Sequence, residues 1–392
     1  MVSKKVIAIV IVVALVTCGA GVALALNGGG GSDDSTRAER QSCSPYTVKD
    51  LSGKETTLDY KLGAVATQYS GSGGPFVIMS AILGKNLHKH LVGTEGLNPN
   101  RMDIWNSFSN DMPELKKLPK LGTIGTDWDS SAVALLNPDA LITSTKQKKE
   151  LETNGVDKAF AKANIPIFYI NLHSEEITDI CNSIRLIGKL FGKEDRADEL
   201  ANYYETKASS VYKRVANILL TKERPVVYSE LSIDGPAKLS NSYGNDIMWG
   251  ALIYKCGGKN VQTTGYTPLE SAVVLTANPS KILFTGSYWA NNTTAIQMGF
   301  EADEATARAK AKTFFTERVG WTELDAYKNN NVYVINHGLS REVWDFASVM
   351  FLAKMIFPEE FKDLDPYKEL DTFYKTFLPF KLHGCWYLEP KA

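Results

Sequence analysis

The sequence predicts an α/β protein made of two lobes joined by a single long helix, and three observations carry this prediction. Short strand-like runs alternate with helical ones in both halves, which is typical of parallel sheets with helices on their faces. One helix-turn-strand phrase occurs twice, as "WDSSAVALLNPDALITS" (128–144) and "LESAVVLTANPSKILFTGS" (269–287). Between the halves lies a proline-free segment rich in helix formers, with apolar residues at helical spacing.

Along the chain, the first expected element is a hairpin, because "YTVKDLSGKETTLDY" alternates around Ser-Gly. The first half continues with the runs "GAVAT", "FVIMSAIL", "KHLVGT", "SSAVALL", "DALITS" and "AKANIPIFYI". In the helical segment, Gly188 and Gly192 predict a division into two helices. The second, 194–219, would be about 39 Å long at about 1.5 Å per residue. The second half repeats the alternation with "PVVYSE", "YGNDIMWGALIYKCGG", "ESAVVLTA", "KILFTGS" and "NNVYVI".

The repeated phrase has the same layout in both copies. An acidic residue, Asp129 or Glu270, lies nine positions before a proline, Pro138 or Pro279, that follows an asparagine. The residue before a proline is pushed out of the helical region, so Asn-Pro ends a helix and the next apolar run is a buried strand. We therefore expect one such unit in each lobe.

Composition bounds the class of protein. With 392 residues, 44% of them apolar and 22% charged, the chain has room for two globular domains of ordinary size. The formal net charge of −1 gives no reason to expect nucleic acid or another polyanion as a partner.

The N-terminal segment predicts export. Residues 6–26 carry no charge and follow Lys4 and Lys5, which matches one bilayer-spanning helix that starts on the cytoplasmic side. Three treatments stay open: an uncleaved anchor, a signal peptide cut after the A-x-A at 23–25, and lipidation at Cys18. All three place the rest of the chain outside the cell membrane.

These observations divide the chain into five parts. They are an N-terminal anchor or signal segment (1–26), a Gly/Ser-rich flexible linker (27–44), an N-terminal α/β lobe (45–193), a bridging helix (194–222) and a C-terminal α/β lobe (223–392).

Over 46–377 the chain resembles the vitamin B12/iron-siderophore (ferrichrome-type) family of ABC-importer binding proteins. The resemblance rests on the order and spacing of "TVKDLSGKE", "NPDALITS", "LIGKLFGKEDRADELANYYE", "YGNDIMWGALIYKCGGKNV", "GWTELDAYKNNNVYVIN" and "AKMIFPEEFKDLD". It implies two Rossmann-like lobes joined by a helical backbone (class III), with a ligand between them that is an iron-siderophore, haem or a corrinoid. It also implies a monomer that delivers this chelate to a permease with its ATPase.

In that family, an acid on each lobe docks against the permease, and the counterparts here are Asp129 and Glu270. The N-lobe acid is Asp rather than Glu, and both acids lie about two residues further from the proline than the family pattern expects; Ser131 and Ala272 occupy the nearer positions. Helix capping is an alternative role. "TPLE" (267–270) matches a capping box with proline at the first helical position, and "TDWD" (126–129) is its acidic relative.

Ligands of open parallel sheets bind beyond the carboxyl ends of the strands. Aromatic faces there supply contact area, and arginine forks hold carboxylates, which suits a bulky anionic chelate. The loop "SGSGGP" (70–75) is either an anion-binding helix start or a plain turn. Trp249, inside a helical run, is expected in the core. The predicted ligand-binding residues are Tyr69, Arg101, Trp105, Trp128, Tyr243, Tyr266, Tyr288, Trp289, His337, Arg341 and Trp344.

Other functions stay open as alternatives. Direct Zn²⁺ or Mn²⁺ binding needs about three histidines plus a carboxylate that converge, and the chain has five histidines. Haem bound through Tyr69 or His337 is another form of the chelate hypothesis. An exported hydrolase is the enzyme alternative, but no nucleophile elbow, P-loop, dinucleotide fingerprint or H-E-x-x-H occurs. A tethered scaffold is the third class. We expect a binding protein without intrinsic cofactor or resident metal.

Overall fold

The computed structural model describes residues 37–69, 74–95, 102–289 and 292–390. The expected membrane segment 1–26, most of the linker and Arg101 lie outside these residues. Residues 35–392 form one compact unit by their internal contacts. No helix in the described ranges is long and apolar enough to cross a membrane.

The predicted hairpin is confirmed. Strands β1 (Gln41–Lys49) and β2 (Glu55–Lys61) pair antiparallel. The turn places Gly53 at φ +87°, a backbone conformation that glycine adopts without steric cost.

The N-terminal lobe is built on a parallel sheet. Strands β3 (Ala66–Thr67), β4 (Leu141–Ser144) and β5 (Ile167–Ile170) pair in that order, and isolated parallel bridges Val65–Leu91 and Thr94–Lys120 extend the sheet beyond β3. Its helices are α1 (Pro75–Leu83), α2 (Met102–Asp111), α3 (Ser130–Leu135), α4 (Lys148–Thr153), α5 (Val156–Lys162) and α6 (Ile177–Phe191). The run "FVIMSAIL" is therefore the buried helix α1.

The C-terminal lobe has a mixed sheet rather than the fully parallel one expected. Strands β6 (Val226–Leu231), β10 (Lys281–Gly286) and β11 (Val332–Asn336) are parallel, and the short β8 (Lys259–Asn260) is parallel to β6. Three further strands run antiparallel to their neighbours: β7 (Asn241–Tyr243), β9 (Tyr266–Pro268) and β12 (Tyr387–Leu388). The connection from β6 to β7 is too short to hold the crossover helix that a parallel pair requires.

Six helices alternate with or follow the strands of this lobe along the described chain. They are α8 (Met248–Lys255), α9 (Ser271–Ala277), α10 (Glu304–Thr316), α11 (Asp325–Lys328), α12 (Asp345–Ile356) and α13 (Pro366–Phe377). Trp249 in α8 is fully buried, as predicted.

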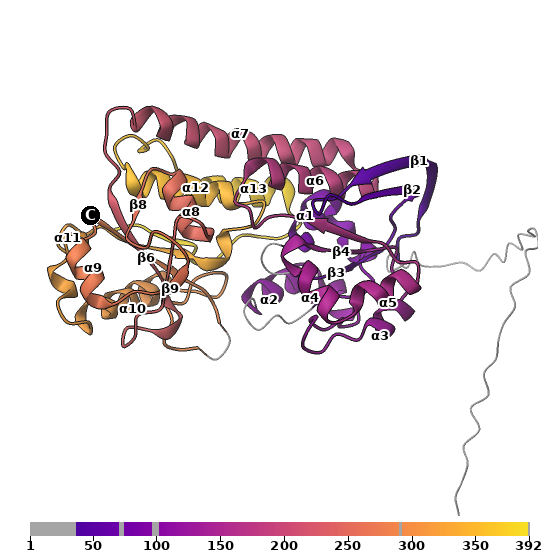
Figure 1. Cartoon of the computed structure of the whole chain (residues 1–392), viewed down its shortest axis with the longest axis horizontal. Helices are drawn as coiled ribbons and strands as arrows, with labels where there is room; N and C mark the ends of the chain where they lie inside the picture. Colours follow the sequence, from indigo (N-terminus) through magenta and orange to yellow (C-terminus); the bar gives the residue numbers. More distant parts are fainter. Residues whose placement is uncertain (1–36, 70–73, 96–101, 290–291, 391–392) are drawn as a thin grey trace, which may run out of the picture. The chain divides into compact units, whose positions relative to one another are not determined.

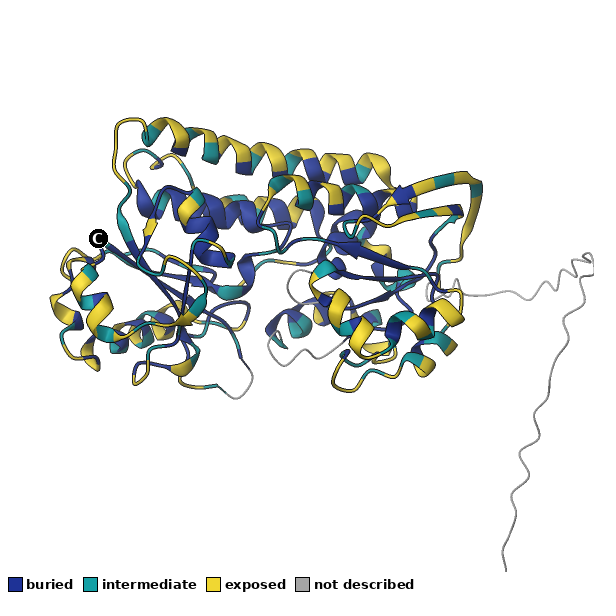
Figure 2. Cartoon of the chain, viewed as in Figure 1, coloured by how far each residue is buried: buried dark blue, intermediate teal, exposed yellow. Residues whose placement is uncertain are grey.

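One 25-residue helix, α7 (Glu194–Ile218), joins the lobes as predicted and packs against α6 and α12 (Figure 1). Its buried residues face these helices and its other side is exposed (Figure 2). Gly192 ends α6 at φ +62°, but Gly188 lies inside α6 and does not divide the segment. A Cβ at Gly188 would lie 2.2 Å from the Cβ of Ala197. Gly188 thus allows α6 and α7 to approach closely.

The repeated phrase folds as the predicted unit in both lobes. In the N-terminal lobe it forms α3 and β4, and in the C-terminal lobe α9 and β10. The asparagine before each proline is left-handed, with φ +50° at Asn137 and +39° at Asn278. Asparagine tolerates this conformation better than most residues, so Asn-Pro ends both helices.

Candidate functional site

The N-terminal half of the candidate site follows β3, β4 and β5. The ring of Tyr69 meets that of His173 edge to face, with centroids 6.4 Å apart. The Nδ1 atom of His173 lies 3.1 Å from the hydroxyl of Ser144, the last residue of β4. The carboxyl ends of three neighbouring strands thus bring a phenol, an imidazole and a hydroxyl together.

The C-terminal half is centred on His337, which follows β11. Its Nδ1 atom lies 3.2 Å from both the Tyr243 hydroxyl and Thr285 Oγ1, at the end of β10. The ring of Trp289 is 5.9 Å from the imidazole, and Tyr266 lies 5.0 Å from Tyr243. Tyr243 is fully buried and contacts both His337 and Tyr266, so it helps to fix their positions.

Arg341 connects the two halves. Its Nε donates to Glu175 Oε1 at 2.7 Å, and the side chains are only 16% and 5% exposed. Glu175 comes from the loop after β5, so this ion pair joins the lobes. Beside it, Lys255 Nζ donates to Glu176 Oε1 at 2.8 Å and to the Glu175 carbonyl at 2.5 Å.

Backbone strain is concentrated at these residues. Apart from asparagines, the non-glycine residues with positive φ in the described chain are Tyr69 (+63°), Glu175 (+54°), Met248 (+45°) and Arg341 (+61°). Three of these four belong to the candidate site. Such conformations cost on the order of 1–3 kcal/mol each and are retained where the surroundings hold them, often at ligand sites.

The imidazole of His173 is held neutral. Burial, followed by the nearby positive charges of Arg341 and Lys146, lowers its pKa to about 3. Burial also raises the pKa of the Tyr69 and Tyr266 phenols. At neutral pH the site therefore offers neutral aromatic and hydroxyl groups beside the positive charges of Arg341 and Lys146.

Several predicted ligand residues lie elsewhere in the lobes. Trp344 is fully buried and stacks on Tyr374 of α13 with centroids 5.5 Å apart, so its assignment to the ligand site is corrected to a core role. The half-buried Trp105 packs against the main core, and Trp128 packs on Phe160. Tyr288 is half-buried next to Trp289.

His173 and Glu175 were not among the predicted site residues. Both follow β5 directly, in "IFYINLHSEE", so the rule that places ligands at strand ends would have found them. The ion pair with Arg341 could not be found in this way, because its partners lie 166 positions apart.

A metal site made only of protein groups has no support in the described residues, where no group of three His, Cys, Asp or Glu side chains converges. His88 and His90 bond instead to the carbonyls of Lys85 and Gly63. Cys43, Cys181, Cys256 and Cys385 are all free thiols, so none of the possible pairings is formed.

The two acids of the repeated units are exposed and begin their helices. Asp129 is the N-cap of α3 and accepts from the amides of Ser131 and Ala132. Glu270 occupies the same position before α9, but its side chain makes no capping hydrogen bond. Both capping-box predictions are wrong in register, because each helix starts after the acid and Pro268 belongs to strand β9.

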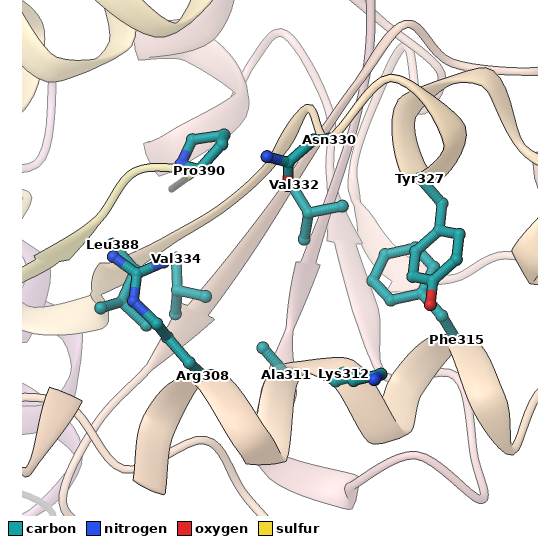
Figure 3. Close-up of a pocket in the computed structure, with 10 residues that line it drawn as sticks. All are labelled: Arg308, Ala311, Lys312, Phe315, Tyr327, Asn330, Val332, Val334, Leu388 and Pro390. Atoms are coloured by element: carbon teal, nitrogen blue, oxygen red, sulfur yellow. The ribbon is translucent and has the colours of Figure 1, made fainter. Parts of the chain in front are cut away.

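A separate cavity of about 470 Å³ lies between α10 and strands β11 and β12 (Figure 3). Val332, Val334 and Phe315 contribute apolar walls, and Arg308 and Lys312 lie along the helix. Arg308 is already engaged by Glu304 and the Glu389 carbonyl. The cavity shares no residue with the strand-end site.

Fold and site together define a two-lobe binding protein with one bridging helix. The periplasmic binding protein family model matches residues 102–337, which is more than half of the chain. The chain is also similar to the crystal structure of the TroA-like periplasmic binding protein FepB from Veillonella parvula. That similarity has 38% identity and a TM-score of 0.85 and covers 88% of this chain and 100% of the other.

Two curated proteins are more distant relatives. The ABC transporter substrate-binding lipoprotein YvrC of Bacillus subtilis is 23% identical over 64% of this chain and 71% of its own length. The molybdate-binding protein MolA of Haemophilus influenzae is 20% identical over 74% of this chain and 80% of its own. The chain belongs to the periplasmic binding protein family, the substrate-binding components of ABC importers.

Proposed function

We propose that the protein captures a metal chelate, an iron-siderophore, haem or a corrinoid, and delivers it to an ABC-importer permease. The observation that carries the proposal is the joining of strand-end residues from both lobes at the Arg341–Glu175 pair. The charge of Arg341 acts on His173 of one lobe and Tyr266 of the other, and an arginine fork near aromatic rings suits a bulky chelate with an anionic group.

A small oxoanion is the second candidate. It is favoured by the similarity to a molybdate-binding protein and by the presence of arginine and hydroxyl groups at the site. The aromatic rings of Tyr69, Tyr266 and Trp289, which pack on His173, Tyr243 and His337, favour the larger chelate, because an oxoanion has little apolar surface for aromatic rings to cover.

The binding test is native mass spectrometry with differential scanning fluorimetry on the chain from residue 35 onward. The probes are ferric siderophores, haem, cobalamin, molybdate, and free Zn²⁺ and Mn²⁺. Stabilisation by a chelate, through selective binding to the folded state, is the expected result. Binding of molybdate or free metal, with no response to any chelate, would contradict the chelate assignment.

Delivery is proposed to use Asp129 and Glu270 as the paired contacts with the permease. Both side chains are exposed and both precede the helix of a repeated unit. Because Glu270 makes no capping bond, the capping alternative does not account for its acid, whereas it does account for Asp129. We also propose that residues 1–26 attach the protein to the outer face of the membrane. The proposed lobes are residues 45–193 and 223–392.

A further inference from the structure

The ion pair between the lobes is buried on both sides. Arg341 follows the last parallel strand of the C-terminal sheet, and Glu175 follows the last strand of the N-terminal sheet. Their side chains are 16% and 5% exposed. Removing one member of such a pair leaves a buried charge without compensation, so the geometry of each depends on the other.

Only one edge of the guanidinium is used by this pair. Nε donates to Glu175, whereas Nη1 and Nη2 make no hydrogen bond to the residues that the structure describes. The charge of Arg341 adds to the lowering of the His173 pKa by burial on one lobe, and opposes the raising of the Tyr266 pKa by burial on the other. The Nη edge of the Arg341 guanidinium therefore lies near candidate ligand residues of both lobes and is left to bind a ligand.

The backbone holds both partners in place. Glu175 and Arg341 are left-handed, at φ +54° and +61°. The Glu175 carbonyl accepts from Lys255 Nζ, and the backbone of Arg341 lies close enough to the buried Asp345 carboxyl to influence its pKa. A strained conformation fixed by contacts on each side orients the guanidinium before any ligand arrives.

We propose that Glu175 is a positioning residue: it holds Arg341 by Nε, presents the Nη edge to one anionic group of the ligand, and limits the negative charge the ligand can carry. This inference rests on the proposed function. The charge limit follows because the buried Glu175 compensates Arg341, whereas the neighbouring Lys255–Glu176 pair is 29% and 60% exposed and is screened by solvent. A chelate of low net charge is thus favoured over a polyanionic one.

The test compares Glu175→Gln and Glu175→Ala with the matched control Glu176→Gln. The control removes the same charge one position away, from a side chain that is 60% exposed and pairs with Lys255 rather than Arg341. The probes are a neutral ferric trihydroxamate and a triply anionic ferric tris-catecholate, and circular dichroism verifies folding of each variant.

Glu175→Gln keeps an acceptor for Nε but removes the charge. It is expected to shift the preference toward the triply anionic chelate by about tenfold, whereas the control changes it less than about twofold. Glu175→Ala is expected to weaken binding of both chelates because Arg341 is no longer held. Equal shifts in Glu175→Gln and Glu176→Gln, or unchanged binding in Glu175→Ala, would overturn the proposal.

A measurement without ligand keeps the two proposals distinguishable. Phenylglyoxal labels accessible arginines, and peptide mass spectrometry reports the modification of Arg341. Faster labelling in Glu175→Ala than in the wild type, with the Glu176→Gln control unchanged, supports the positioning role. Equal rates refute it. If the wild type binds neither of these chelates nor haem nor cobalamin, the proposed function fails, and the labelling result still decides the role of Glu175.

Discussion

The two repeated units share a fold and one kind of hydrogen bond, from a tryptophan to the serine after the acid, but differ in how their acids are used. In both, a tryptophan indole donates to the serine hydroxyl that follows the acid: Trp128 to Ser130 at 3.0 Å, and Trp321 to Ser271 at 2.9 Å. Asp129 caps its helix through two amides, whereas Glu270 leaves its carboxylate out of the helix start.

The support behind each tryptophan also differs. Trp128 is half-buried and packs on Phe160. Trp321 is fully buried, and the guanidinium of Arg318 lies 4.4 Å from its ring centroid and pairs with the buried Glu230 at 2.7 Å. An exposed acid at a helix start is thus held by a local helix cap in the N-terminal lobe, whereas the matching helix start in the C-terminal lobe is supported by a buried ion pair.

The largest expected effect concerns the shared role of the two acids. The double charge reversal Asp129→Lys and Glu270→Lys is expected to abolish transporter-dependent uptake. Ligand affinity should stay unchanged, because both residues are exposed and neither is a candidate ligand residue. Uptake by cells expressing the permease, with affinity measured by titration, tests this. Normal uptake by the double variant would show that these acids do not dock against the permease.

The second prediction tests the buried support in the C-terminal lobe. Glu230→Gln leaves the Arg318 charge buried, and also weakens the bond from Tyr228, so it should lower the free energy of unfolding by about 3–5 kcal/mol. Chemical denaturation measures the change. Glu323→Gln, in an exposed pair with Lys328, is the control and should cost at most about 1 kcal/mol.

The comparison extends to how each lobe meets the bridging helix α7. The N-terminal lobe uses the close approach at Gly188, whereas the C-terminal lobe uses the buried carboxyl of Asp345, which accepts from Tyr204 at 2.7 Å. Burial raises the pKa of Asp345 to about 7, from 3.8. The carboxyl is then protonated in the folded state and ionised in the unfolded state between these pH values.

The sign follows from that difference. As pH rises, the Asp345 carboxyl loses its proton in the unfolded state before it does so in the folded state. This group therefore lowers the free energy of unfolding progressively as pH rises from about 4 to about 7. Asp345→Asn should therefore gain stability relative to the wild type over that interval, by several kcal/mol at most. Denaturation at a series of pH values checks this. A pH-independent difference would show that Asp345 is ionised in the folded protein.

The smallest effects separate the two helix starts. Asp129→Ala should lower the free energy of unfolding by about 1 kcal/mol because two amides lose their acceptor. Glu270→Ala should change it by less than about 0.5 kcal/mol because no capping bond is lost. Thermal and chemical denaturation of the two variants measure both values. Equal losses would mean that Glu270 caps α9 in solution.

The order of strands and helices could be predicted because apolar periodicity and Asn-Pro breaks act over a few residues. The direction of β7, β9 and β12 could not, because pairing direction depends on connections and on partners far along the chain. The helix start at α9 could not be predicted for the same reason: the sequence "TPLE" suits a capping box, but Pro268 belongs to strand β9, where it pairs with Asn241.

The same division applies to the site. The sequence by itself determined the two-lobe α/β design, the bridging helix and the strand-end positions of Tyr69, Trp289, His337 and Arg341. Only the tertiary structure decided that Trp344 is core and that Arg341 pairs with Glu175. The physical reason is that burial and ion pairing depend on which residues meet in space, and local sequence patterns do not encode a meeting between segments from two different lobes.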